Sequence, residues 1–124
     1  MQIGDCEEKP MPCESVQEII DTLATAEAFA VTLLGEALES ARNGKLKLDA
    51  EQTLSFKAGR AADQAHYAFL KGAGARPSTT SFTLPDPGVV TDPETFLKAM
   101  IELEELAVAA YLAAAQAFAL QKQT

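Results

Sequence analysis

The stretch that decides the fold runs from Asp92 to Gln121 and reads DPETFLKAMIELEELAVAAYLAAAQAFALQ. Asp92 suits the N-cap of a helix, Pro93 its first helical position, and Glu94 complements the positive end of the helix dipole. Apolar side chains then recur at alternating steps of three and four, which is the seam period of helical bundles. The stretch therefore predicts a long helix over 93–121 and an all-α fold.

An earlier segment carries the same kind of signal. Ser15 and Glu18 form a capping box, in which each side chain satisfies a free backbone N–H group of the first turn. Asn43 and Gly44 supply the residues that commonly end a helix. These signals predict a first helix over 15–42.

A second helix is predicted over 49–71, with Asp49 as its N-cap and Gly72 as its stop. The next residues, 72–92, read GAGARPSTTSFTLPDPGVVTD, a composition typical of a loop. We expect Phe82 and Leu84 to hold this loop against the helices.

The loop lengths predict the topology. The link between the first two helices is short, so these helices should be antiparallel neighbours. A loop of some 20 residues can span ~60 Å, whereas the second helix should be ~35 Å long. The loop can therefore run back along the bundle, which makes the second and third helices parallel.

The length of 124 residues fits one domain. We divide it into an irregular N-terminal arm, residues 1–14, and a helical domain, residues 15–124. Cys6 and Cys13 both lie in the arm, and their spacing matches neither a redox motif nor a zinc site. The sequence leaves open whether they form a local disulfide.

The net charge is −8. This charge argues against binding to nucleic acid, which needs Lys and Arg to neutralise phosphates, and against anionic membrane surfaces. No uninterrupted apolar run reaches the ~18–20 residues of a membrane span, and no signal-like segment follows Met1. A cytoplasmic location is the default expectation. The acidic balance is compatible with cation binding, but it is also the ordinary composition of a soluble surface.

The seam positions of the three helices are apolar except near their middles. Those interruptions are Glu27 in the first helix, Asp63 with His66 in the second, and Glu104 in the third. A buried carboxylate without a partner costs several kcal/mol, so three at similar heights suggest that a cation compensates their charge. Asp63 and His66 are three residues apart, which places both on one helical face. Carboxylates with an imidazole suit iron, manganese or zinc.

Ordinary structural roles are the alternative for each of these residues. His66 could be a hydrogen-bonded core or boundary residue. Any of Glu102, Glu104 and Glu105 could point to solvent, because the three lie close together at the edge of the stripe. Tyr111 could be a core aromatic whose hydroxyl reaches a carboxylate.

Three segments resemble the bacterial ferritin-like domain proteins. They are Ile19–Glu27 (IIDTLATAE), Ala65–Leu70 (AHYAFL) and Leu103–Leu112 (LEELAVAAYL). In that family, an apolar run ending in Leu-Glu, a Glu-x-x-His followed by an apolar residue, Phe and Leu, and a Leu-Glu before Ala-Ala-Tyr occur in this order. The resemblance extends over residues 15 to about 121.

The resemblance implies a four-helix bundle with one long crossover and a di-iron or di-manganese site. Glu27 and Glu104 would be its single carboxylates, and Asp63 with His66 one of its two carboxylate–histidine pairs. This chain departs from the pattern in two ways. Asp63 replaces the usual, longer Glu, and no fourth helix follows before Thr124.

A three-helix version of such a bundle would leave an apolar groove exposed. Monomers seldom expose large apolar patches, so we expect a homodimer or higher homo-oligomer to form through the groove; a truncated chain is the other explanation.

The sequence leaves two candidate functions. One is a metal-binding protein related to iron oxidases or iron stores, holding iron or manganese at Glu27, Asp63, His66 and Glu104. The other is a non-catalytic helical interaction module that kept the fold and lost the metal chemistry. Hydrolase motifs are absent from the sequence.

Overall fold

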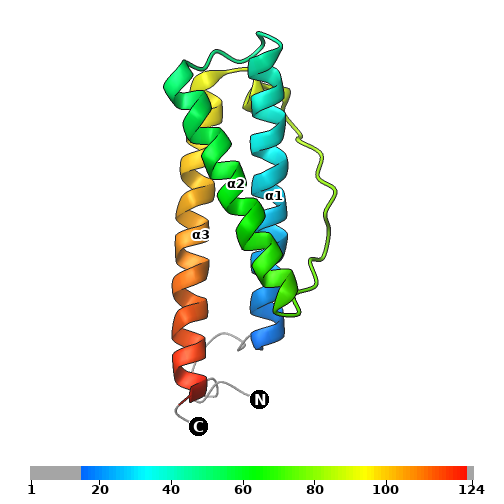
Figure 1. Cartoon of the computed structure of the whole chain (residues 1–124), viewed down its shortest axis with the longest axis vertical. Helices are drawn as coiled ribbons and strands as arrows, with labels where there is room; N and C mark the ends of the chain where they lie inside the picture. The colour runs from blue at the N-terminus through cyan, green and yellow to red at the C-terminus, as the bar shows by residue number, and fades with distance from the viewer. Residues whose placement is uncertain (1–14, 123–124) are drawn as a thin grey trace.

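The computed structural model describes residues 15–122 and confirms the all-α prediction (Figure 1). It contains the helices α1 (Val16–Arg42), α2 (Ala50–Gly72) and α3 (Pro93–Lys122), and a short 3₁₀ helix, η2 (Pro87–Val90). The three long helices agree with their predicted ranges to within one residue at each end. The predicted arm, with Cys6 and Cys13, lies outside the described residues.

The helix ends follow the predicted capping chemistry. The Ser15 side chain accepts a hydrogen bond from the backbone N–H of Glu18, which is one of the two bonds of the predicted capping box. Asp49, predicted as an N-cap, forms a complete capping box with Gln52. Gly44, with a φ of 75°, follows the end of α1 as expected. The end of α2 differs from the prediction, because the residue with positive φ is Gly74 (97°) and the helix continues through Gly72.

The long loop returns along the bundle, as its length predicted. Figure 1 shows it running beside α1 from the end of α2 to the start of α3, so that α2 and α3 are parallel. Three residues of α1 hold it by hydrogen bonds. Gln17 donates its side-chain N–H to the backbone carbonyl of Gly74 at 3.0 Å. Asp21 accepts from the backbone N–H of Arg76 at 2.7 Å, and Thr25 accepts from that of Ser78 at 3.0 Å. Phe82 packs edge-on against Phe29 with ring centroids 5.3 Å apart, and Leu84 packs against the core, which confirms both predicted anchors.

Two separate hydrophobic clusters form the core. The cluster near the start of α1 consists of Ile20, Leu23, Ala24, Leu70, Ala75 and Ala114. The cluster near its end consists of Leu33, Leu34, Ala37, Leu46, Phe96 and Met100, with Leu84, Val89 and Val90 of the loop packed against it. The middle of α1, where Glu27 lies, falls between them.

Helix α1 packs against both other long helices, whereas the backbones of α2 and α3 stay more than 8 Å apart, Cα to Cα. Much of α3 is consequently exposed, including Ile101, Leu106, Val108 and Leu112, each 58% or more accessible. By length and composition alone, Pro93–Leu120 of α3 would also suffice to cross a membrane. Those two properties do not distinguish a membrane span from a helix whose apolar faces are covered by protein.

Candidate metal centre

The antiparallel packing of α1 and α2 brings Glu27 beside Asp63 and His66. The Nδ1 atom of His66 lies 3.4 Å from Oε1 of Glu27 and 4.0 Å from Oδ1 of Asp63. One ligand atom from each of the three side chains falls within 4.8 Å of the other two. The seam periodicity predicted these three residues as part of a group that also included Glu104 of α3.

Glu27 is the most enclosed member of the group, with 6% of its surface accessible. It lies between the two hydrophobic clusters, where water cannot solvate its charge. Its Oε1 accepts a hydrogen bond of 2.6 Å from the Tyr111 hydroxyl. The Tyr111 ring also packs edge-on against His66, with centroids 6.3 Å apart. Tyr111 therefore fixes one Glu27 oxygen from the α3 side while His66 faces the same oxygen from α2.

The electrostatics of the group favour a bound positive charge. Burial, together with the neighbouring carboxylates of Glu27 and Glu104, raises the pKa of Asp63 to about 6, against the opposing effect of His66. A cation would favour the ionised form of Asp63, as any opposite charge does within ~4–6 Å. Burial and the Glu27 carboxylate also raise the pKa of Tyr111, so its hydroxyl stays protonated and remains a donor.

Glu104 is placed less closely than the other three. It lies on α3 and is exposed, and its carboxylate is outside the group of atoms within 4.8 Å. It nevertheless lines the same groove as Asp63 and His66 and is near enough to influence the pKa of Asp63. The separation of α2 from α3 accounts for this position.

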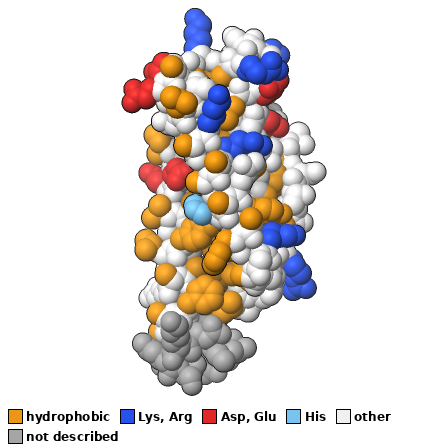
Figure 2. Space-filling view, in the orientation of Figure 1, with side chains coloured by type: hydrophobic (Ala, Val, Ile, Leu, Met, Phe, Trp, Pro, Cys, Tyr) orange, Lys and Arg blue, Asp and Glu red, His pale blue; other side chains and the backbone are white. Residues whose placement is uncertain are grey.

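A groove of about 630 Å³ opens between α2 and α3, and Asp63 and His66 of the group line it. Its apolar walls include Leu34, Phe56, Met100 and Ile101. The His66 side chain is 56% accessible. In Figure 2 it lies at the surface, with hydrophobic side chains beside and below it. A small molecule could therefore approach the group from the groove.

The structure tests the ordinary structural roles that the sequence left open for these residues. His66 is exposed, so it is not a core histidine, and Glu27 is buried, so it does not reach water from the edge of its helix. Glu102, Glu104 and Glu105 are all exposed. The sequence analysis missed a second polar site, a basic pocket at the C-terminal end of α1. Its residues come from α1, α2, their connector and η2, and no sequence motif links them.

Comparison of this chain with protein-family models, curated proteins and solved structures gives no match. The resemblance to ferritin-like domain proteins therefore stays a prediction from the sequence motifs within α1, α2 and α3.

Proposed function

We propose that this chain is a ferritin-like metal-binding protein that holds iron or manganese with Glu27, Asp63 and His66, and with Glu104 as a more distant ligand. The observation that carries the proposal is the convergence of three ligand atoms within 4.8 Å. They come from two helices, and one of them belongs to a carboxylate that is 6% accessible.

The donor set fits these metals. Two carboxylates and an imidazole suit iron and manganese, and also zinc. The Asp63 carboxylate, which burial and its neighbours push toward the protonated form, would be ionised beside a divalent cation. The net negative charge of the group would then be offset without a proton.

Each residue would have a distinct role. Glu27 and Asp63 would supply charge, and His66 would supply a neutral nitrogen. Tyr111 would orient Glu27 through its hydrogen bond, in the way that outer residues commonly fix metal ligands. A bound iron or manganese ion would supply one-electron chemistry, and the open groove beside His66 leaves room for a small oxidant.

Manganese titration by isothermal calorimetry, followed by elemental analysis of the dialysed protein, tests the proposal. We expect one or more Mn²⁺ ions per chain in the wild type. Glu27→Gln and His66→Ala should each weaken binding at least tenfold, because even the loss of a residue that only orients a metal ligand typically weakens binding ~10–100-fold. Glu102→Gln is the matched control, because Glu102 is exposed on α3 two residues from Glu104. Substoichiometric metal, or equal losses in all three variants, would contradict the proposal.

The second candidate is the interaction module, and one observation favours it. Large apolar side chains of α2 and α3 are exposed in the described part of the chain: Leu54, Phe69, Ile101, Leu106, Val108, Leu112 and Phe118. We propose that a second copy of the chain covers the α3 face in a homodimer, the commonest closed assembly. Metal content and molecular mass distinguish the candidates, since a pure interaction module is a dimer without metal.

A further inference from the structure

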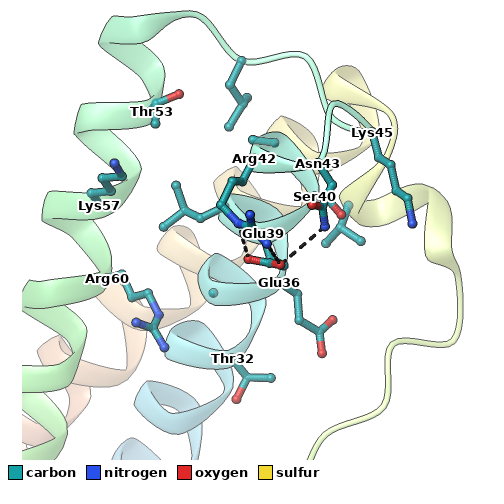
Figure 3. A pocket seen from close by; sticks show the side chains of 15 residues that line it. Thr32, Glu36, Glu39, Ser40, Arg42, Asn43, Lys45, Thr53, Lys57 and Arg60 are labelled. Atoms are coloured by element: carbon teal, nitrogen blue, oxygen red, sulfur yellow. Dashed lines mark hydrogen bonds and ion pairs between the residues drawn. The ribbon is translucent and has the colours of Figure 1, made fainter.

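A second pocket, distinct from the candidate metal centre, lies where α1 ends and α2 begins. It has a volume of about 980 Å³ and is formed by the last turns of α1, the first turns of α2, their connector and Val90 (Figure 3). Four basic residues line it, against two carboxylates: Arg42, Lys45, Lys57 and Arg60, with Glu36 and Glu39. A chain with a net charge of −8 therefore carries a locally positive pocket.

Arg60 is held in a fixed position against α1. Its Nε donates a hydrogen bond of 3.1 Å to the backbone carbonyl of Val31. The guanidinium lies against Gly35, where an added Cβ would be only 3.0 Å from Nε and 3.2 Å from Nη2. The missing side chain at Gly35 is what lets Arg60 approach the helix this closely, and Figure 3 shows it reaching from α2 toward α1.

The outer edge of this guanidinium is unpaired. Neither Nη atom makes a hydrogen bond or ion pair with another described residue, although Glu36 lines the same pocket. A guanidinium fixed through Nε presents its remaining N–H groups as a fork, which matches two oxygens of a phosphate or carboxylate.

Lys57 adds a second positive charge on the same side of the pocket. It precedes Arg60 by three residues on α2, so both side chains project from one helical face. Lys57 and Lys45 form no ion pair within residues 15–122, whereas Arg42 is paired with Glu39. Among the described residues, the unpaired positive charges of the pocket are therefore those of Arg60, Lys57 and Lys45, and the first two share one face of α2.

We propose that this pocket binds a small phosphate monoester, with Arg60 as the bidentate contact and Lys57 as the second cation. Two adjacent positive groups suit the doubly charged phosphate better than a carboxylate. The volume exceeds what a phosphate alone would fill, and Leu38, Leu48 and Val90 supply apolar walls for an organic group. The proposal does not depend on the metal centre.

Phenyl phosphate, which joins a phosphate to an apolar ring, is the probe for calorimetry and for amide chemical-shift mapping by NMR. We expect saturable binding, with the largest shifts at Gly35, Lys57 and Arg60, and weaker binding of inorganic phosphate and of benzoate. Arg60→Gln should reduce the affinity at least tenfold. Lys98→Gln is the matched control, because it removes the same charge from α3, outside the pocket.

Gly35→Ala gives a test that loss of folding cannot imitate. Alanine is the better helix former at a position inside α1, so the helix is retained, while the added Cβ displaces the Arg60 guanidinium. We expect a tenfold loss of phenyl phosphate affinity together with an unchanged or higher unfolding temperature. Binding should persist in the Glu27→Gln variant. No saturable binding, or equal weakening by Lys98→Gln and Arg60→Gln, would overturn the proposal.

Discussion

Single residues decide the chemistry of the candidate centre, and Tyr111 is the first that can be tested without metal. Its hydroxyl is the donor to the buried Glu27 oxygen. Tyr111→Phe leaves that oxygen without its hydrogen bond. We expect the free energy of unfolding of the metal-free protein to fall by about 1–2 kcal/mol, measured by urea denaturation. Tyr67→Phe is the control, since the Tyr67 hydroxyl makes no hydrogen bond to another described residue. If both variants lost the same free energy of unfolding, the hydrogen bond from Tyr111 to Glu27 would contribute nothing to the stability of the protein.

Asp63 predicts how the stability of the metal-free protein depends on pH. Its pKa in the folded chain, about 6, lies above the ordinary 3.8, so the folded state binds this proton more tightly than the unfolded state. The resulting stabilisation is complete below pH 3.8 and is lost as the pH rises through 6. It amounts to roughly 1–3 kcal/mol.

The measurement is urea denaturation between pH 4 and pH 7.5, comparing the wild type with Asp63→Asn. Other carboxylates titrate with the opposite sign, because hydrogen bonds lower the pKa of Asp21 and Asp92. The readout is therefore the difference between the two proteins, which should change steadily in favour of Asp63→Asn as the pH rises. A constant difference would contradict the raised pKa of Asp63.

Metal binding should show the reverse dependence on pH. A metal needs the ionised form of Asp63, and protons compete with it as the pH falls below about 6. We expect the affinity for Mn²⁺ to rise with pH and to level off above that point. The affinity of Asp63→Asn should change less over the same range.

Three of the four residues that the sequence predicted for the candidate site lie together in the structure. Seam periodicity placed Glu27, Asp63 and His66 on facing stripes, and the structure brings these three together. Glu104 occupied an equivalent position in the pattern, yet its carboxylate lies outside the group. Periodicity defines a face of one helix, whereas the distance between α2 and α3 depends on side-chain packing such as that of Phe56 on Phe96, whose centroids are 5.0 Å apart.

Among the elements, the loop between α2 and α3 carries the clearest prediction. Its Phe82 ring packs against Phe29 of α1. Phe82→Ala removes this contact and leaves the helices in place, so the loop should open more often and be cleaved faster in limited proteolysis. Phe69→Ala is the matched control, because Phe69 is 76% exposed on α2. Unchanged cleavage of Phe82→Ala would mean that the other contacts of the loop, its hydrogen bonds to α1 and the packing of Leu84, are sufficient to hold it.

Local chemistry explains why the element boundaries were predictable and η2 was not. A cap such as Asp49 with Gln52 involves residues only three positions apart, so a short stretch of sequence is enough to predict it. The η2 turn begins after Asp86, whose side chain accepts from the backbone N–H of Gly88 at 2.8 Å. In the sequence, this Asp-Pro-Gly stretch is as typical of a simple turn as of a short helix. Packing of Val89 and Val90 on the core accompanies the helical form.

For the whole molecule, the sequence predicted the order and direction of the three helices but not how unevenly they pack. Helix α1 carries most of the buried side chains, and α2 has one buried residue, Leu70. The seam period predicted that the face of α3 with Glu104 would turn inward, and Tyr111 on that face does reach Glu27 of α1. It did not predict that the backbones of α2 and α3 would stay more than 8 Å apart. The exposed face of α3 is the consequence.

The exposed face of α3 leads to a prediction about self-association. Leu112, 66% exposed, lies eleven residues after Ile101 and four after Val108, so the three form one row along α3. If a second copy covers this row, light scattering should give the mass of a dimer, and Leu112→Gln should shift the protein toward the monomer. Leu54→Gln is the control at nearly the same exposure, 67%, near the start of α2. A monomer at all concentrations would contradict self-association. A monomer that floats with lipid vesicles would instead assign the apolar face of α3 to a membrane.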